Sequence, residues 1–121
     1  VLEYTEYCGN YYGTPRKAVE DMLNAGKDVI LKIEVEGAMN IKRLFPECCL
    51  VFILPPSMQE LERRLRKRGT ETEESIQERL EIARNELAQQ DKFTLKLVND
   101  RVDTCADALY EAICRRIESA E

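Results

Sequence analysis

Three short apolar runs that alternate with helical patterns place the strongest constraint on the fold of this chain. The runs cover residues 28–35 (DVILKIEV), 48–54 (CCLVFIL) and 93–98 (FTLKLV). Their β-branched and aromatic residues are typical of buried strands. Strands that alternate with helices predict an α/β fold, in which helices flank both faces of a mostly parallel sheet and form three layers. In such folds ligands bind at the carboxyl ends of the strands.

The segment before the first run is expected to form a short strand at residues 1–7, a turn-rich stretch at Gly9–Gly13 and a helix. Thr14 supplies a helix cap and Pro15 a first-turn proline, and Gly26 ends the helix. Spacings of three and four predict a buried stripe on this helix, made of Ala18, Val19, Met22 and Leu23.

Two further helices are expected beside the second and third runs. A short helix is predicted to open at Gly37 and to end before Pro46. The last helix is predicted to be capped by Asp103. Its expected inner positions are Ala106, Leu109, Tyr110, Ile113 and Ile117.

Residues 57–79 carry the densest basic cluster and read as two helices around a glycine break. Ser57 with Glu60 forms a helix-capping pattern, and Gly69 ends that helix. Thr70 with Glu73 repeats the capping pattern at the start of the next helix. The expected buried positions are Met58, Leu61 and Leu65, followed by Ile76, Leu80, Ala83 and Leu87.

The arginines of this stretch have two interpretations. Arg64 and Arg68 are four residues apart, so they share one helix face, and Arg79 lies on the following helix. Basic residues on a helix usually form a solvated face. Two helices around a basic turn are also the expected form of a hinged phosphate clamp.

Composition excludes several classes of function. The 121 residues are 44% hydrophobic, which predicts a single domain over residues 1–121. The net charge of −5 argues against a nucleic-acid binder. No apolar run approaches the ~20 residues of a membrane span. Five cysteines without a C-x-x-C pair make a disulfide framework or a metal site unexpected, and we expect a cytoplasmic protein.

The absence of histidine narrows the chemistry further. It excludes Ser-His and Cys-His nucleophilic catalysis and any histidine general base. An enzyme built from this sequence works through carboxylates, arginines or backbone amides. That set favours positioning and charge stabilisation, as in phosphoryl transfer.

Several polar residues near predicted strand ends are candidates for nucleotide binding. Glu34 is either a carboxylate in water or paired with Lys32, or an acceptor for the paired N–H donors of guanine. Glu3 is a second candidate for the same role. Thr14 is most simply a helix cap, although its hydroxyl can also donate to guanine O6. Tyr12 either packs or meets a phosphate oxygen.

Asn99 follows the third predicted strand and precedes Asp100. This pair usually marks a turn. An asparagine amide at a strand end can also read an adenine edge, because it has both a donor and an acceptor.

The order of these pieces resembles the guanylate kinases, the ATP:GMP phosphotransferases of the P-loop nucleoside monophosphate kinases. The matching motifs are E-Y-x-E-x-x-G-N-Y-Y-G-T from Glu3, V-I-L-K-I-E-V-E-G from Val29 and F-I-L-P-P-S from Phe52. R-L-R-K-R-G-T-E-T-E-E-S-I-Q-E-R-L from Arg64 and V-N-D from Val98 complete the series. They follow the family order over nearly the whole chain.

The resemblance implies a role for each candidate residue. Glu3, Thr14 and Glu34 would read guanine, and Tyr12 would meet the GMP phosphate. Residues 1–14 would then be a remnant of the GMP-binding lobe, and residues 69–90 the lid region, with its hinge from Gly69 to about Ile76. The ATP phosphates and the transferring phosphoryl group would be held by Arg64, Arg68 and Arg79, and the adenine would lie at Asn99. Mg²⁺ would be carried by ATP and water, without protein ligands.

Two departures from the family pattern stand out. No G-x-x-x-x-G-K-[ST] phosphate loop is present, so the chain resembles the C-terminal portion of a kinase, truncated at the N-terminus. The family's phosphate-loop strand would lie between the first two predicted strands. Strand exchange or homodimerisation is one expected way to fill that gap. Lys32 stands where the family often has an acidic residue and would partly neutralise Glu34 or Glu36.

Three functions remain open at this point. The first is GMP phosphorylation by the parent protein, with the isolated chain inactive. The second is a non-catalytic guanylate-kinase-like module that binds a phosphorylated protein partner. Such modules generally lose the arginine of the R-G-T motif and the asparagine after the third strand, whereas this chain keeps Arg68, Arg79 and Asn99. The third is a structural fragment that binds GMP weakly.

Overall fold

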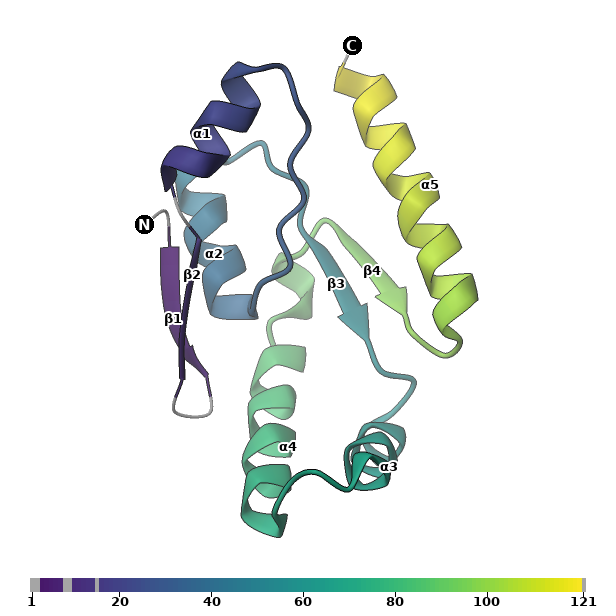
Figure 1. The fold of residues 1–121 in the computed structure, drawn as a ribbon. Helices are drawn as coiled ribbons and strands as arrows, with labels where there is room; N and C mark the ends of the chain where they lie inside the picture. The colour runs from purple at the N-terminus through teal and green to yellow at the C-terminus, as the bar shows by residue number, and fades with distance from the viewer. Residues whose placement is uncertain (1–2, 8–9, 15, 121) are drawn as a thin grey trace. The chain divides into compact units, whose positions relative to one another are not determined.

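Two sheets of two strands each organise the chain (Figure 1). A computed structural model describes residues 3–7, 10–14 and 16–120, with side chains described for 16–119. The chain divides into two units, residues 1–48 and 49–121. The first unit contains β1 (Glu3–Tyr7), β2 (Asn10–Thr14), α1 (Arg16–Asn24) and α2 (Val35–Leu44). The second contains β3 (Val51–Leu54), α3 (Met58–Arg68), α4 (Glu73–Leu87), η1 (Gln90–Lys92), β4 (Leu95–Val98) and α5 (Val102–Ala120).

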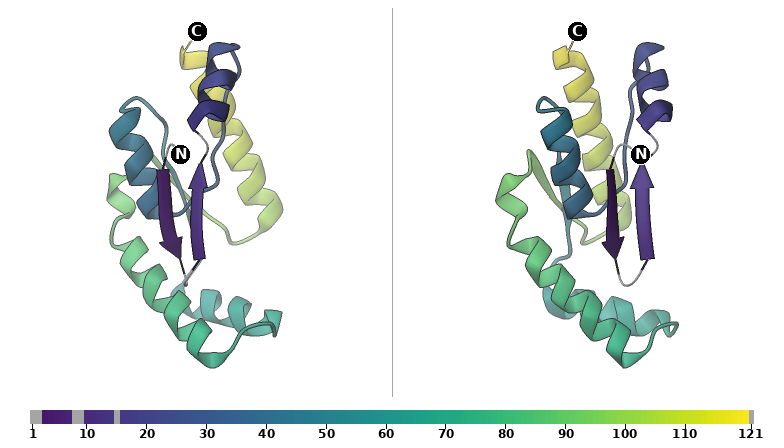
Figure 2. Two further views of the ribbon diagram at one scale, coloured as in Figure 1. Left: turned by 60° about the vertical axis from the view of Figure 1, so that its left-hand side comes forward. Right: turned by 90° about the vertical axis from the view of Figure 1, so that its left-hand side faces the viewer.

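An antiparallel hairpin opens the first unit (Figure 2). β1 pairs with β2 in a register that sets Glu3 opposite Thr14 and Tyr7 opposite Asn10. The strand expected at residues 1–7 is therefore present from Glu3. The turn-rich prediction for Gly9–Gly13 is wrong from Asn10 onward, because these residues form the ladder that completes β1.

Residues 27–34 form no strand, so the strand predicted at 28–35 is wrong. A strand needs a neighbour to accept and donate its backbone hydrogen bonds, and none pairs with this segment among the described residues. The side chains nevertheless alternate as in a strand. Val29, Leu31 and Ile33 pack on the core of Val19 and Ile41, while Ile30 is 71% exposed.

Helix α1 ends where predicted, but its apolar stripe is less buried than predicted. α1 ends as expected near Gly26, which has a positive φ of 78°. Its stripe is only partly buried. Val19 is in the core, but Ala18 is exposed. Met22 and Leu23 are 42% and 43% exposed, because this short helix meets the core at one position.

α2 begins at Val35, two residues before the predicted start at Gly37, and Glu34 is its N-cap residue. The apolar run therefore ends in a helix. Beyond the C-terminal end of α2, the ammonium group of Lys42 donates to the carbonyl oxygens of Pro46, at 2.5 Å, and of Cys48, at 3.5 Å. Lysine donors of this kind satisfy carbonyl groups beyond a helix end.

The second unit is built on a parallel pair of strands. β3 and β4 pair in register from Val51 with Leu95 to Leu54 with Val98. The rings of Phe52 and Phe93 meet edge to face with centroids 4.9 Å apart. An α/β organisation is thus confirmed. The parallel sheet has two strands among the described residues, fewer than the three predicted, because residues 27–34 stay outside the ladder.

α3 and α4 form a helical hairpin in the second unit (Figure 2). Leu65, Ile76 and Leu80 make its core. Met58 and Leu61 pack against that core, which confirms the predicted stripe of α3. The start and end of α3 are also as predicted.

Ser57 Oγ accepts the backbone N–H of Glu60 at 3.0 Å, and Gly69 adopts the left-handed conformation at φ 67°. The predicted cap of α4 is wrong by two residues. Thr72, not Thr70, is the N-cap, and its Oγ1 accepts the N–H of Ser75 at 3.2 Å. Glu73 follows Thr70 at the third position and completes a capping box, whereas Ser75 follows Thr72, so the local sequence favours the threonine that does not cap the helix.

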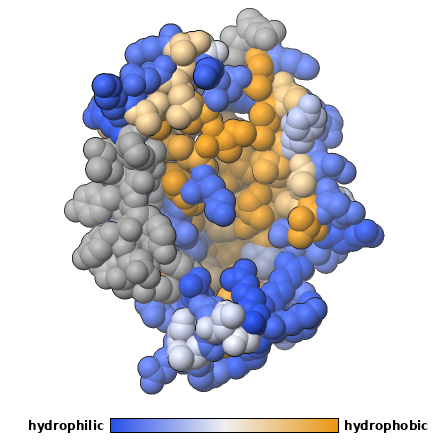
Figure 3. Space-filling view, in the orientation of Figure 1, coloured by the Kyte–Doolittle hydropathy of each residue, from blue (hydrophilic) through white to orange (hydrophobic). Residues whose placement is uncertain are grey.

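α5 begins at Val102, so the predicted cap Asp103 lies in the first turn. Its carboxylate accepts the N–H of Thr104 at 2.8 Å. Cys105 is buried, whereas the predicted inner residue Tyr110 is 71% exposed. Ile53, Val98 and Val102 are also exposed in this unit. Figure 3 shows hydrophobic residues at the surface on the face that it presents. No helix in the described part of the chain is long and apolar enough to span a membrane.

Carboxylate–arginine pairs line the α3–α4 hairpin. Glu60 accepts from Arg63 and Arg64, and Arg63 is the main cause that lowers the pKa of Glu60 to about 2. Arg66 pairs with Glu73 and lowers the pKa of that carboxyl group to about 2, with help from Gln77. Both carboxyl groups therefore favour the folded state when ionised.

The capping geometry predicts that Thr72→Ala destabilises the protein by about 1 kcal/mol, because the Ser75 N–H loses its acceptor. Thr70→Ala is the matched control, since Thr70 is exposed and caps nothing. Urea denaturation followed by circular dichroism measures both. Equal losses for the two variants would contradict the assigned cap.

The lowered pKa values predict a specific acid dependence of stability. A carboxyl pKa depressed in the folded state stabilises the protein above the unfolded value of 4.5, and this contribution is lost as pH falls toward about 2. Glu60→Gln and Glu73→Gln should each make the free energy of unfolding fall less steeply over this range. Glu78→Gln, which alters an exposed carboxylate of α4, should leave the slope unchanged. Denaturation curves at several pH values would show the difference.

Candidate functional site

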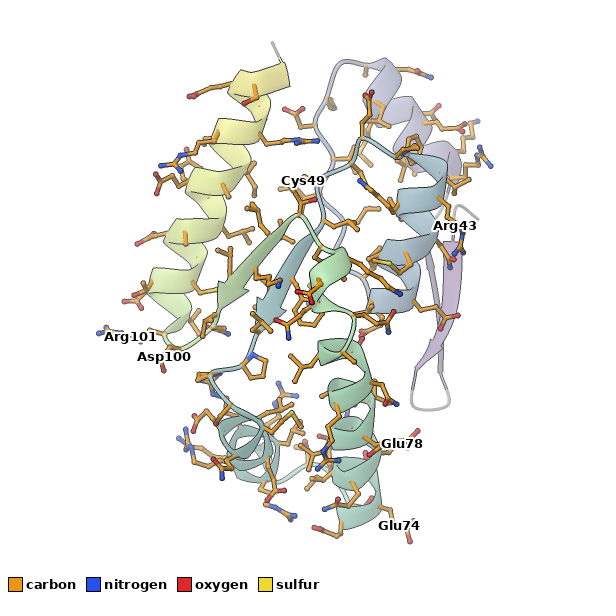
Figure 4. All side chains as sticks on the ribbon, turned by 180° about the vertical axis from the view of Figure 1, so that it is seen from behind. Arg43, Cys49, Glu74, Glu78, Asp100 and Arg101 are labelled. Atoms are coloured by element: carbon orange, nitrogen blue, oxygen red, sulfur yellow. The ribbon has the colours of Figure 1, made fainter. Side chains whose placement is uncertain are left out.

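Arg64 joins α3 to the connection between β4 and α5. Its Nε donates to Glu60 Oε1 at 3.0 Å, one helical turn earlier. Its two terminal nitrogens donate to the carbonyl oxygens of Asn99 and Asp100, at 2.9 and 3.1 Å. Figure 4 shows Asp100 and Arg101 in this connection. The structure thus brings together two residues that the sequence assigned to the ATP side, Arg64 and Asn99.

Asn99 is anchored by its backbone. Its N–H donates to the carbonyl of Leu54 at 2.7 Å, which continues the parallel ladder past β4. Its side-chain Oδ1 is buried and has no hydrogen-bond partner within the described residues. A buried acceptor without a partner is costly, so an amide held in this way is suited to a ligand donor.

Arg68 is in a different setting from Arg64, although both lie on α3. It is exposed at the last residue of the helix and forms no ion pair with any residue whose side chain is described. Its neighbour Arg66 pairs with Glu62 and Glu73. Arg68 is therefore the arginine of this cluster whose charge is least compensated by the protein.

Arg79 forms an ion pair with Glu71, in the short connection between α3 and α4. The Glu71 side chain is 12% exposed and that of Arg79 is 31% exposed. Ser75 Oγ also donates to Glu71 Oε1, at 3.2 Å. Sequence reasoning missed Glu71. Its position within an acidic run, T-E-T-E-E, gives no sign that this carboxylate is the buried one.

The candidate guanine-reading residues all fall in the first unit. Glu34 is partly buried, and its side chain makes no capping hydrogen bond to α2. Its carboxylate is therefore not occupied by the helix that follows it. Lys32 is exposed and forms no ion pair with Glu34 or Glu36, whose side chains are both described.

Glu3, Tyr12 and Thr14 lie in the β1–β2 hairpin. The backbone register pairs Glu3 with Thr14, and Tyr12 is two residues away on β2. The side chains of these residues lie outside the part that is described. The structure therefore collects three of the four predicted GMP residues in one hairpin, and α2, which follows Glu34, contacts β1.

The two units carry different kinds of functional group. The first unit carries carboxylates, which can accept from the N–H donors of a purine, together with a hydroxyl and a phenol, which can donate to purine or phosphate oxygens. The second unit carries guanidinium groups and an amide, which suit phosphate oxygens and a purine edge. Among residues with described side chains, no three His, Cys, Asp or Glu residues gather as metal ligands would. Cys48, Cys49, Cys105 and Cys114 are free thiols.

Comparison with known proteins points to one family. The sequence profile of the family described as guanylate kinase matches residues 1–116. A guanylate kinase from Desulfitobacterium hafniense is 50% identical over 109 residues, which are 90% of this chain and 54% of that protein. A guanylate kinase from Oceanobacillus iheyensis is 48% identical over 113 residues, 93% of this chain and 55% of the relative.

Comparison with solved structures identifies the same family. The crystal structure of guanylate kinase from Anaplasma phagocytophilum matches with a TM-score of 0.78 at 30% identity, over 96% of this chain and 55% of that one. The chain thus spans about half the length of the relatives that it matches. Sequence profile, relatives and fold agree, and the chain belongs to the guanylate kinase family.

Proposed function

We propose that this chain supplies the GMP-reading residues and the ATP-side arginines of an ATP:GMP phosphotransferase. The reaction transfers the γ-phosphoryl group of ATP to GMP and yields GDP and ADP. The family match supports the reaction class. The hydrogen bond from Arg64 to the backbone carbonyl of Asn99 is the main support for these residue roles, because it joins two predicted ATP-side residues.

The arginines suit the charge that develops in phosphoryl transfer. The transition state spreads negative charge over the phosphoryl oxygens, and preorganised guanidinium groups stabilise it. Arg64 is held by Glu60 and two carbonyl oxygens, and Arg79 by Glu71, so neither has to be ordered when ATP arrives. Arg68 is exposed and uncompensated, and it is proposed to meet phosphate oxygens directly.

Mg²⁺ is proposed to arrive with ATP. Magnesium in such reactions keeps several waters and is held largely by the nucleotide phosphates. When bound, it neutralises phosphate charge. This chain's own contribution is then to orient the phosphates through Arg64 and Arg68, and to hold the adenine edge at Asn99, whose side-chain oxygen is buried and unpartnered in the described part of the chain.

On the GMP side, Glu34 is proposed to accept the paired N–H donors of guanine. Its carboxylate is partly buried and makes no cap hydrogen bond. A carboxylate accepts from guanine N1–H and N2–H₂ but opposes the N1 lone pair of adenine, which accounts for a preference for GMP over AMP. Glu3 and Thr14 are proposed to share this reading, and Tyr12 to contact the GMP phosphate. The relatives are named guanylate kinases, so the comparisons give no support to a non-catalytic module.

The proposal predicts that the 121-residue chain alone makes no GDP from GMP and Mg-ATP, because the sequence holds no phosphate loop. Joining the chain to the part of the Desulfitobacterium hafniense guanylate kinase that the match leaves uncovered gives a chimera. The chimera should produce GDP, measured by coupling ADP formation to NADH oxidation. GMP turnover by the chain alone, or an inactive but folded chimera, would contradict the proposal.

Glu34→Gln in the chimera should raise the KM for GMP about 10- to 100-fold, because a charge-assisted hydrogen bond to guanine is lost. Glu36→Gln is the control, because Glu36 is exposed in the first turn of α2. Steady-state kinetics with GMP and with AMP separate guanine reading from a general loss of activity. An unchanged KM for GMP in Glu34→Gln would remove the guanine-reading role.

A further inference from the structure

The connection between α3 and α4 contains a carboxylate that neither the predicted site nor the helix caps require. Glu71 lies between the C-cap Gly69 and the N-cap Thr72. Its side chain is 12% exposed, whereas the carboxylates of Glu62 and Glu73 in the neighbouring Arg66 pairs are 44% and 61% exposed. A carboxylate is seldom buried without a specific partner.

The partner of Glu71 is Arg79, two turns into α4. Ser75 Oγ holds the same carboxylate oxygen from one turn earlier, at 3.2 Å. The second oxygen, Oε2, is buried and has no hydrogen-bond partner within the described residues. The turn therefore retains a half-satisfied carboxylate close to a guanidinium, an arrangement that contributes little to stability as such.

We propose that Glu71 is a positioning residue, which fixes the guanidinium of Arg79 toward the phosphates of the bound nucleotides. This inference rests on the proposed function, in which Arg79 stabilises the transferring phosphoryl group. A guanidinium has five N–H donors in a rigid plane, more than one carboxylate can occupy. A carboxylate that engages the Nε edge sets the orientation of that plane.

The burial of its carboxylate sets this pair apart from the other ion pairs of the hairpin, because the Glu71 side chain is 12% exposed, against 26% for Glu60 in its pair with Arg64. Exposed pairs exchange readily with water and salt, and they hold a side chain only loosely. The carboxylate of Glu71 is the more shielded member of its pair with Arg79, so we expect the guanidinium to keep its orientation before any nucleotide binds. Preorganised charge of this kind speeds the chemical step more than it tightens substrate binding.

The kinetic test uses Glu71→Gln in the chimera, which keeps the shape of the side chain and an oxygen for Ser75. We expect kcat to fall about 10- to 100-fold with the KM for GMP changed less than about twofold. Glu71→Asp should recover part of the rate. Glu78→Gln is the matched control, because Glu78 is exposed and projects away from α4 in Figure 4.

A double variant tests whether Glu71 affects kcat through Arg79. If Glu71 acts through Arg79, then adding Glu71→Gln to Arg79→Met should cause no further loss of kcat. A further loss as large as in the parent chimera would overturn the proposal, and so would a normal kcat in Glu71→Gln. Normal activity of Arg79→Met, or an inactive chimera, would instead remove the proposed function and this inference with it.

A measurement on the 121-residue chain itself tests the pairing without catalysis. The Nε–H proton of Arg79 should exchange slowly with water in an NMR spectrum of the parent chain and of Glu78→Gln. It should exchange rapidly in Glu71→Gln. Rapid exchange in the parent chain would show that Glu71 does not hold Arg79, and would overturn the proposal.

Discussion

Backbone hydrogen bonding decides which apolar runs of this chain become strands. Three runs have similar composition, yet only those with a neighbour in the described structure form a ladder. β3 and β4 pair with each other, and the ladder continues past its end through the N–H of Asn99 to the carbonyl of Leu54. Residues 27–34 alternate like a strand but pair with nothing described. Burial of apolar side chains explains why they alternate along the segment. A hydrogen-bonded ladder, however, forms only where a neighbouring strand is present.

The same constraint positions Arg64 and Asn99, the residues proposed for the ATP side. Because β4 is paired, the carbonyl groups of Asn99 and Asp100 have fixed places just beyond its end, where Arg64 reaches them from α3. One guanidinium therefore links the helical hairpin to the sheet of the second unit. Arginine is suited to this link, since its planar fork can serve a carboxylate and two carbonyl oxygens at once.

Local features were predictable from sequence, and features that depend on distant partners were not. Ser57 and Gly69 were placed correctly because a cap and a left-handed glycine depend on a few neighbouring residues. The predicted cap of α4 is wrong because the capping-box pattern favours Thr70, although the helix begins after Thr72. Strand formation at 27–34 was wrongly predicted because pairing is non-local.

The candidate site shows the same division. Arg64 and Asn99 were singled out by motif, and the structure joins them. Their contact involves the backbone carbonyl of Asn99, which no side-chain pattern predicts. Glu71 was overlooked because its burial comes from the packing of a turn, and an acidic run in sequence resembles a solvated one.

Acidic partners explain how an acidic chain can carry a cluster of arginines, here proposed to bind phosphates. The protein has a net charge of −5, and most arginines of the hairpin are already paired, Arg64 with Glu60, Arg66 with Glu73 and Arg79 with Glu71. Exposed pairs contribute little to stability, so a phosphate oxygen can replace a carboxylate at low cost. A pair whose carboxylate is largely shielded, such as Glu71 with Arg79, is expected to resist such exchange and to fix an orientation instead. The hairpin thus combines an exposed pair that can change partners, Arg66 with Glu73, with two arginines that are held, Arg64 and Arg79. The proposed nucleotide site needs both kinds, because it has to bind nucleotides, orient them and release them.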